Sequence, residues 1–339
     1  MNGAVVRSGP PTMRDVAATA GVSKALVSIV FRGAPGASEE TRARVFAAAS
    51  SIGYRANRTA SLLALHRNKH LGLTLNVRNA FHGELVEALQ SAADEAGYEI
   101  VLSTVSSSHD ERRAVETLLE FRCEALVLLG SDLPRAELER LAATRPVVVV
   151  GRRVSATGVD VVRTADDRGL EAAVGHLVSL GHRQIFHVDG GRGSIAADRR
   201  RGYLRSMRRH GVADQARVVD GGGGEADGRR AADELLRGPL PTAVTAFNDH
   251  AALGVLDRLT RAGVDVPGSV SVTGYDDSLV AQLAAVDLTS VSQEATVQAA
   301  QTIRAAVERL EGTRPQPQQT VLEPRLVVRG STAAPRWDD

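Results

Sequence analysis

Short apolar runs alternate with amphipathic stretches along most of the chain. The runs at 125–129 and 147–150 are apolar throughout, which is typical of strands buried on both faces of a parallel sheet. The stretches between the runs repeat apolar residues every three or four positions, as one face of a helix requires. The pattern predicts further strands at 71–77, 99–105, 185–188, 217–219, 243–247, 270–274, 320–322 and 326–329. It predicts helices at 83–96, 110–121, 135–143, 171–180, 198–209, 226–236, 250–262 and 295–310.

This alternation of strands and helices runs twice, once before and once after residue 164. Each series predicts a doubly wound parallel sheet with helices on both faces, and such sheets bind ligands at the carboxyl ends of their strands. We therefore expect an α/β body at 70–332, followed by a tail at 333–339. The two subdomains are expected at about 70–163 with 294–320, and at about 164–293 with 321–332.

The first part of the chain has the pattern of three short helices, at 13–20, 24–31 and 39–51. Residue types that cap helix N-termini precede or begin them, namely Thr12 with Asp15, Ser23, and Ser38. Gly21 allows the positive φ of a tight turn between the first two helices. Two helices around so short a turn predict a helix-turn-helix, whose second helix fits the major groove of DNA. An ordinary three-helix bundle is the alternative.

Charge is distributed unevenly along the chain. The 339 residues have a net charge of +1, yet residues 1–69 carry ten Lys or Arg and three Asp or Glu, so they contribute +7 and the remainder −6. A basic segment on an acidic body favours binding of a polyanion, although an uneven solvated surface would have the same charges. We therefore expect a disordered tail at 1–11, a helix-turn-helix headpiece at 12–56, and a hinge helix with its linker at 57–69.

Composition narrows the classes of function. Cys123 is the only cysteine, which excludes an intramolecular disulfide and a cysteine-rich zinc site. Aromatic residues make up 3% of the chain, which argues against stacking along a single nucleic-acid strand. No apolar run approaches the roughly 18 residues of a membrane helix, and no secretory signal is recognised. We expect a cytoplasmic protein, nucleoid-associated when bound to DNA, with no catalytic residues, cofactor or metal.

The headpiece resembles that of the lac repressor (LacI/GalR) family of bacterial transcription regulators. The similar segments are TMRDVAATAGVSKALVS at 12–28, SEETRARV at 38–45 and GYRANR at 53–58. In the body, the similar segments are FNDHAALG at 247–254, VSVTGYDD at 270–277 and LVVRGST at 326–332. The resemblance implies a body like the periplasmic sugar-binding proteins, and a repressor that binds a palindromic operator under control of a sugar-like effector. No heptad run follows the body, so a homodimer is expected rather than a tetramer.

The resemblance also implies which residues contact DNA. Lys24 and Ala25 match the main base-reading positions, and Ile29 stands where many members of the family have an arginine. An arginine binds guanine through two hydrogen bonds, whereas isoleucine offers only apolar contact, so we expect an atypical operator half-site. The other positions implied at the phosphates or in the grooves are Thr12, Ser23, Ser28, Ser38, Thr41, Tyr54, Asn57, Ala60 and Leu63.

The segment at 57–64 is too short to be a stable helix alone, because isolated helices need roughly 12–15 residues. By the resemblance, two such hinge helices pair in the minor groove of the operator, where Leu63 would wedge a central base step and Ala60 would fit the groove floor. A flexible linker whose leucines touch the body is the alternative.

Polar residues follow several of the predicted strands of the body. Asn and Asp offer the mixed donors and acceptors that suit hydroxyl groups, although capping of the next helix is an equal alternative for Asp249 and Asp277. In the family, the positions that match Arg199, Asn248 and Asp276 bind polar groups of the effector. The remaining candidates are Phe81 and His82 against an effector ring, with Ser107, Arg152 and Gln293.

Two other classes of function compete with this interpretation. Residues 191–196 have the G-x-G-x-x-A pattern of dinucleotide-binding enzymes, with Asp220 after the next strand. A solute-binding protein would explain the body but not the basic headpiece. The consecutive Arg199, Arg200 and Arg201 indicate either an anionic effector or two solvated helix positions beside one binding residue.

Overall fold

The computed structural model describes residues 11–31, 35–54 and 68–336, and the chain divides into two compact units, 1–68 and 69–339. The first unit contains the three expected helices, α1 (Met13–Ala20), α2 (Lys24–Phe31) and α3 (Glu39–Ser51). Val16, Val27 and Val45 form the centre of its small core, with no exposed surface. The tail expected at 1–11 and the hinge helix expected at 57–69 lie almost entirely outside the described residues.

The predicted caps of the headpiece are present. The Leu26 N–H donates to Ser23 Oγ at 3.1 Å, and the Thr41 N–H donates to Ser38 Oγ at 3.3 Å. Gly21 ends α1 with a φ of 65°, so the turn to α2 uses the left-handed region that glycine allows. The helix-turn-helix geometry is therefore set by short-range interactions that the sequence already contains.

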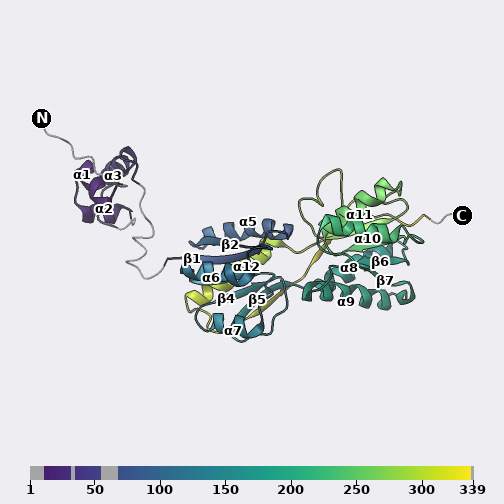
Figure 1. Cartoon of the computed structure of the whole chain (residues 1–339). Helices are drawn as coiled ribbons and strands as arrows, with labels where there is room; N and C mark the ends of the chain where they lie inside the picture. Colours follow the sequence, from purple (N-terminus) through teal and green to yellow (C-terminus); the bar gives the residue numbers. More distant parts are fainter. Residues whose placement is uncertain (1–10, 32–34, 55–67, 337–339) are drawn as a thin grey trace. The chain divides into compact units, whose positions relative to one another are not determined.

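The second unit begins with a six-stranded sheet in the order β11-β5-β4-β3-β1-β2, which forms the first subdomain. Every neighbouring pair in this sheet is parallel. Helices α5 and α12 pack on one face and α6 and α7 on the other (Figure 1), so the residues of β3, all buried, contribute alternately to the two cores. Its elements are β1 (His70–Asn76), α5 (Ala80–Glu95), β2 (Glu99–Val105), α6 (Glu111–Glu120), β3 (Ala125–Leu129), α7 (Arg135–Ala142), β4 (Val147–Val150), β5 (Val159–Thr164), α12 (Ala295–Leu310) and β11 (Gln319–Leu322).

The second subdomain has the same architecture, with strand order β12-β10-β9-β8-β6-β7 and only β12 antiparallel to its neighbour. Helices α8 and α9 cover one face of this sheet, and α10 and α11 cover the other (Figure 1). Its elements are α8 (Asp166–Ser179), β6 (Ile185–Val188), α9 (Ser194–Arg209), the 3₁₀ turn Ala213–Gln215, β7 (Arg217–Val219), α10 (Glu225–Leu235), β8 (Ala243–Ala246), α11 (Asp249–Arg261), β9 (Ser271–Asp276), β10 (Thr289–Ser292) and β12 (Arg325–Val327).

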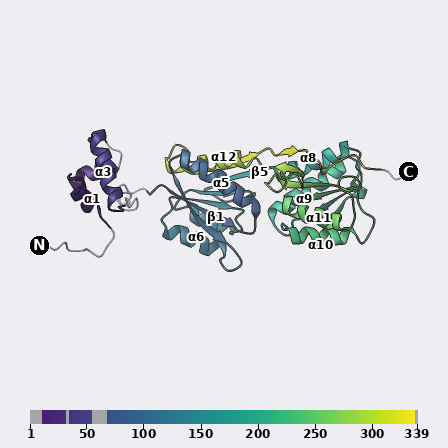
Figure 2. The ribbon, with the colours of Figure 1, turned by 90° about the horizontal axis from the view of Figure 1, so that it is seen from above.

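The chain crosses between the two subdomains three times, after β5, before α12 and after β11 (Figure 2). The crossings lie against one another, because the Ala165 N–H donates to the Leu322 carbonyl and the Thr164 hydroxyl donates to the Gln293 carbonyl. β11 keeps Leu322 in the first sheet, two residues past the crossing expected after residue 320. Within the ranges that the structure describes, no helix is long and apolar enough to cross a membrane.

Two strands were not predicted from the pattern. β5 and β10 are buried throughout, yet their sequences contain Asp160, Arg163, Thr289, Ser290 and Ser292. The Asp160 carboxylate lies 2.7 Å from Arg314 and 3.4 Å from Arg309, so partners distant in sequence make its burial possible. Helices α8 and α9 also begin four or five residues before the expected position, at Asp166 and Ser194.

Candidate functional site

A cavity lies between the two subdomains, at the carboxyl ends of strands in both sheets. The first subdomain lines it with residues from α5, α12 and the ends of β3 and β4, and the second with residues from α9 and the ends of β8 and β9. Its volume is about 50 Å³, which is room for about four water molecules. The space that the two subdomains leave between them in this arrangement is therefore small.

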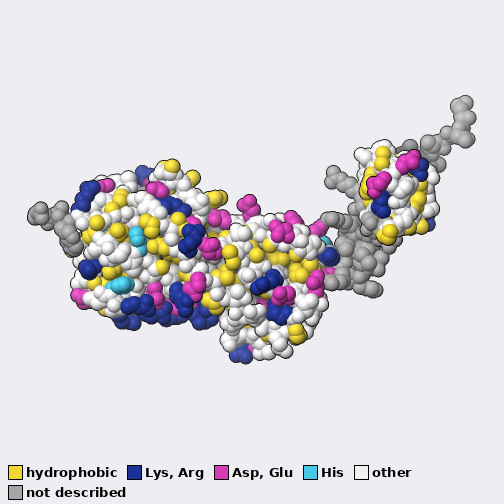
Figure 3. Space-filling model, turned by 180° about the vertical axis from the view of Figure 1, so that it is seen from behind, with side chains coloured by type: hydrophobic (Ala, Val, Ile, Leu, Met, Phe, Trp, Pro, Cys, Tyr) yellow, Lys and Arg dark blue, Asp and Glu magenta, His cyan; other side chains and the backbone are white. Residues whose placement is uncertain are grey.

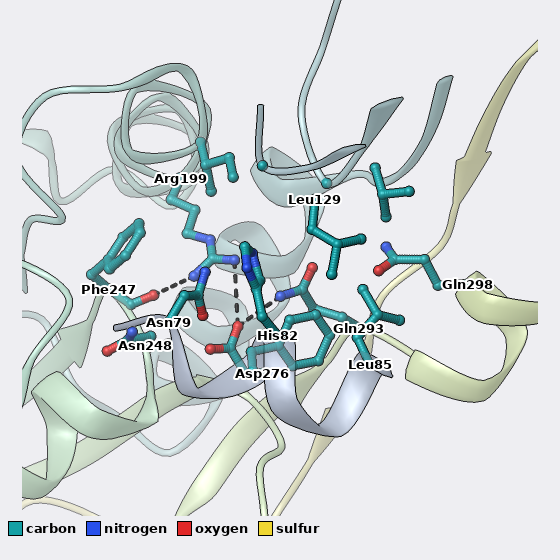
Figure 4. Close-up of a pocket in the computed structure, with 15 residues that line it drawn as sticks. Asn79, His82, Leu85, Leu129, Arg199, Phe247, Asn248, Asp276, Gln293 and Gln298 are labelled. Atoms are coloured by element: carbon teal, nitrogen blue, oxygen red, sulfur yellow. Dashed lines mark hydrogen bonds and ion pairs between the residues drawn. The ribbon is translucent and has the colours of Figure 1, made fainter. Parts of the chain in front are cut away.

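Arg199 on α9 is the central charged group of this cavity (Figure 4). Its Nε donates to Asp166 Oδ1 at 2.8 Å, and its Nη1 donates to the Phe247 carbonyl at 2.6 Å. Its Nη2 lies 3.5 Å from Asp276 Oδ1. The guanidinium also stacks on the ring of Tyr275, with the carbon 3.6 Å from the ring centroid. Because most of its donors are occupied, Arg199 is held rigidly at the cavity wall.

The carboxylates around Arg199 titrate abnormally. Burial raises the pKa of Asp276 well above its usual range, although the Arg199 charge opposes this shift. Burial likewise raises the pKa of Asp166, again against the effect of Arg199. Asp276 also accepts a hydrogen bond from Gln293 Nε2 at 2.7 Å, which orients both side chains in the cavity. A buried cation with two carboxylates forms a polar end that can both donate to and accept from hydroxyl groups.

His82 on α5 contributes a neutral donor from the opposite subdomain. Its Nδ1 accepts the Asn76 N–H at 3.1 Å, and burial lowers the pKa of the ring to about 4. The ring is therefore neutral near pH 7 and carries its proton on Nε2, which lies beside Gly130 at the cavity wall. This assignment follows from the hydrogen bond that Nδ1 accepts.

Asn248 lines the cavity and caps α11 at the same time. Its Oδ1 accepts the Ala251 N–H at 2.8 Å, and its Nδ2 donates to the Gly223 carbonyl at 2.9 Å. Asp249, next in sequence, does not face the cavity but accepts hydrogen bonds from the Ser278 N–H and the Ser290 hydroxyl. Asn248 therefore both caps α11 and lines the cavity, whereas Asp249 does neither.

The structure brings six of the eight proposed effector residues to this cavity. They are Phe81, His82, Arg199, Asn248, Asp276 and Gln293. Ser107 is exposed in the turn after β2 and does not line it. Arg152 does not line it either, because Gly151, with a φ of 88°, turns the chain and the Arg152 side chain donates to the Leu133 carbonyl at 3.1 Å.

Further lining residues were not singled out from the sequence. Asn79 precedes α5, Ile195 lies in the first turn of α9, and Gln298 lies on the buried face of α12. A buried amide among apolar helix positions is a signal that could have drawn attention to Gln298. The apolar lining residues Leu85, Leu129 and Val150 give no such signal, because they are indistinguishable from core residues.

The three consecutive arginines of α9 have different surroundings. Arg200 pairs with Asp189 and Arg201 with Asp198, so only Arg199 reaches the cavity. The exposed arginines of this helix lie along one edge of the second subdomain (Figure 3). The glycine pattern at 191–196 leads into the first turn of α9, which supplies Ile195 to the cavity.

In the headpiece, the proposed base-reading side chains lie at the start of α2. Lys24 and Ala25 are exposed, whereas Ser28 and Ile29 one turn later are half-buried. Tyr54 packs edge-on against Phe31, with ring centroids 5.5 Å apart. The remaining described positions, Thr12, Ser23, Ser38 and Thr41, lie at the N-termini of α1, α2 and α3, where backbone N–H groups favour an anion. Asn57, Ala60 and Leu63 lie outside the described residues.

Comparisons with known proteins match both units. The model for bacterial regulatory proteins of the lacI family matches residues 12–57, and that for a periplasmic binding protein-like domain matches residues 174–332. The HTH-type transcriptional regulator GalR of Escherichia coli (strain K12) is 35% identical over 331 residues, which cover 96% of each chain.

Two solved structures have the same arrangement of elements. The lac repressor dimer bound to operator and the anti-inducer ONPF is 28% identical, with a TM-score of 0.82 over 96% of this chain and 100% of that chain. The complex of the transcriptional regulator CelR with cellobiose is 30% identical, with a TM-score of 0.70 over 95% of this chain and 99% of that chain. The chain therefore belongs to the lacI family of bacterial transcriptional regulators.

Proposed function

We propose that this chain is a cytoplasmic repressor that binds a two-fold symmetric operator as a homodimer, and that a neutral sugar in the cavity between its subdomains sets its affinity for the operator. The observation that carries the proposal is a cavity in which Arg199 and Asp276 lie beside amide side chains and apolar residues. Sugar sites combine a few oriented polar groups with apolar and aromatic surface in this manner. The CelR complex with cellobiose, a carbohydrate, supports this class of ligand.

The surroundings of Arg199 favour a neutral ligand over a sugar phosphate. A phosphate would need unpaired cationic donors, yet Arg199 already faces Asp166 and Asp276 and donates to a backbone carbonyl. His82 adds no positive charge, because its pKa is lowered to about 4. Hydroxyl groups can use the remaining donors and the carboxylate oxygens without a change of charge in the cavity.

Control of DNA binding then follows from linkage. The cavity is lined by both subdomains, so a ligand that binds one arrangement of the subdomains better than another changes the balance between them. If operator DNA prefers one of these arrangements, the effector changes operator affinity and the operator changes effector affinity by the same factor. A dimer is required because a two-fold operator presents two equivalent half-sites.

Selection of a random duplex pool on the full chain tests this function. We expect enrichment of a palindromic motif and a shift in its binding curve on addition of D-galactose, D-glucose, D-ribose or cellobiose. A pool without enrichment at low salt would instead support a solute-binding or enzymatic body. If a palindromic motif is enriched but no sugar alters its binding, the proposed operator stands and the proposed effector mechanism is wrong.

Replacement of Ile29 by arginine should alter which bases the headpiece selects. Ile29 lies on α2 one turn after Lys24, and a guanidinium there can donate two hydrogen bonds to guanine. We expect Ile29→Arg to enrich guanine at one position of each half-site, by roughly 1–3 kcal/mol of discrimination. Arg14→Ala, a charge change on α1, serves as the comparison and should weaken binding of all sequences alike. An identical selected motif for Ile29→Arg and the unaltered chain would contradict the assignment.

A further inference from the structure

Gln298 places an unpaired acceptor at the cavity. The side chain lies on α12 in the first subdomain, has no exposed surface, and lines the cavity across from Arg199 and Phe247 of the second subdomain (Figure 4). Its Oε1 is buried and has no hydrogen-bond partner. A buried acceptor without a partner is costly, so such an atom calls for a donor that the protein itself does not supply.

The orientation of the Gln298 amide follows from its neighbours. Its Nε2 donates to Thr164 Oγ1 at 3.3 Å, and the Thr164 hydroxyl in turn donates to the Gln293 carbonyl at 3.4 Å. The single hydroxyl proton of Thr164 is used in that second bond, so Thr164 can only accept from Gln298. The amide nitrogen therefore faces Thr164, and Oε1 faces away from it.

None of the described residues donates a hydrogen bond to this oxygen. Leu85, Leu129 and Val150 on the cavity wall are apolar, and the two glycines that follow β3 and β4 use their N–H groups elsewhere. The Gly130 N–H donates to the Val150 carbonyl and the Gly151 N–H to the Val162 carbonyl, both at 2.9 Å. A ligand in the cavity can therefore supply the donor that Oε1 lacks.

We infer that Gln298 Oε1 accepts a hydrogen bond from a hydroxyl group of the effector, which makes Gln298 a specificity-determining residue. The inference rests on the proposed function, because it assigns one end of the proposed sugar. The ligand then carries hydroxyl groups at both ends, one set toward Arg199 and Asp276 and one group toward Gln298. A site built to bind a hydroxyl group rejects the analogue that lacks it, because the buried acceptor loses its partner.

The alternative is that Gln298 only holds Thr164 and the crossing segments in place. Substitution would then weaken binding of every ligand by the same factor. If Gln298 instead accepts a hydrogen bond from one ligand hydroxyl, its substitution weakens binding only of ligands that carry this hydroxyl. The substitution and the removal of the hydroxyl then eliminate the same interaction.

The test measures dissociation constants by calorimetry with the full chain. The probes are D-galactose, D-glucose, D-ribose and cellobiose, followed by the series of single deoxy analogues of whichever binds most tightly. The variants are Gln298→Leu and Gln298→Met, so that one remains if the other does not fold. Gln301→Leu makes the same change on α12 at a position outside the cavity, and Thr164→Val removes the amide anchor but leaves Oε1 present.

We expect Gln298→Leu to bind the parent sugar about tenfold more weakly, whereas Gln301→Leu changes binding less than twofold. One deoxy analogue should bind the unaltered chain about tenfold more weakly than the parent sugar does, and should bind Gln298→Leu less than twofold more weakly than the parent sugar does. Equal losses for the parent and all analogues on both Gln298 variants would overturn the inference. Absence of any sugar binding to the unaltered chain would overturn the proposed effector and this inference together, whereas selective binding without an effect on operator affinity would overturn only the proposed control of DNA binding.

Discussion

Replacement of Arg199 by methionine should lower the free energy of unfolding by roughly 3–5 kcal/mol, because the buried Asp166 and Asp276 then lose their cation. Methionine keeps much of the apolar stem but loses the guanidinium, which both faces the two carboxylates and stacks on the Tyr275 ring. The same variant should lose the response of operator binding to sugar, since it removes a polar end of the cavity. Denaturant unfolding followed by circular dichroism, together with operator binding in the presence of sugar, checks both effects.

The pH dependence separates charge from packing in this variant. Burial raises the pKa of Asp166 and Asp276, and removal of Arg199 removes the opposing effect, so both pKa values rise further. A carboxyl group whose folded pKa exceeds its unfolded value binds more protons when folded, and its contribution to stability falls as pH rises through that interval. The difference in free energy of unfolding between the unaltered chain and the less stable Arg199→Met should therefore be larger at pH 8 than at pH 5.

A neighbouring arginine provides the control. Arg201 lies on the same helix with a side chain 60% exposed, and it pairs with Asp198 one turn away. Arg201→Met should lower the free energy of unfolding far less than Arg199→Met, because the Arg201 side chain is largely solvated and Arg153, 3.7 Å from Asp198, still faces that buried carboxylate. An equal deficit for Arg199→Met at pH 5 and pH 8 would show that the loss comes from packing against Tyr275 rather than from the buried charges.

Local patterns were sufficient to predict most of the fold. The caps at Ser23 and Ser38 and the apolar strand at 147–150 are properties of a few consecutive residues, and the structure confirms them. β5 was missed for the opposite reason. Its Asp160 and Arg163 resemble a surface segment until Arg309 and Arg314, some 150 residues later, are brought beside Asp160.

The same distinction between local patterns and long-range contacts applies to the residues of the cavity. Arg199 and Asp276 could be proposed from motifs, whereas Gln298 could not, because its position in the cavity depends on α12 packing against the first sheet. Arg152 was proposed from its place after a strand, but the left-handed turn at Gly151 directs its side chain to Leu133. Motifs thus identify which residue types occur at strand ends, and the backbone conformation decides which of them face a ligand.

Replacement of Gly228 by alanine is expected to separate α10 from α11. A Cβ on Gly228 would lie 2.0 Å from the Ala251 carbonyl oxygen, and one on Gly254 of the facing helix would lie 2.0 Å from the Glu225 carbonyl oxygen. Both obstacles are backbone atoms, so no side-chain rotation relieves the overlap. We expect Gly228→Ala to lower the free energy of unfolding by about 3 kcal/mol, the upper end of the usual cost of overpacking.

The matched control makes the same change on a helix with open space. A Cβ on Gly83 of α5 meets nothing within 4 Å, so Gly83→Ala should raise the free energy of unfolding by about 0.5–1 kcal/mol through helix propensity. The double variant Gly228→Ala with Gly254→Ala should cost less than the sum of its parts, because the first substitution already moves the helices apart. Denaturant unfolding measures the unaltered chain, Gly228→Ala, Gly254→Ala, their double variant and Gly83→Ala, and a Gly228→Ala variant as stable as the unaltered chain would contradict this close packing. Since Asn248 both caps α11 and lines the cavity, a displaced α11 should also weaken sugar binding, which links this remote pair of glycines to the site.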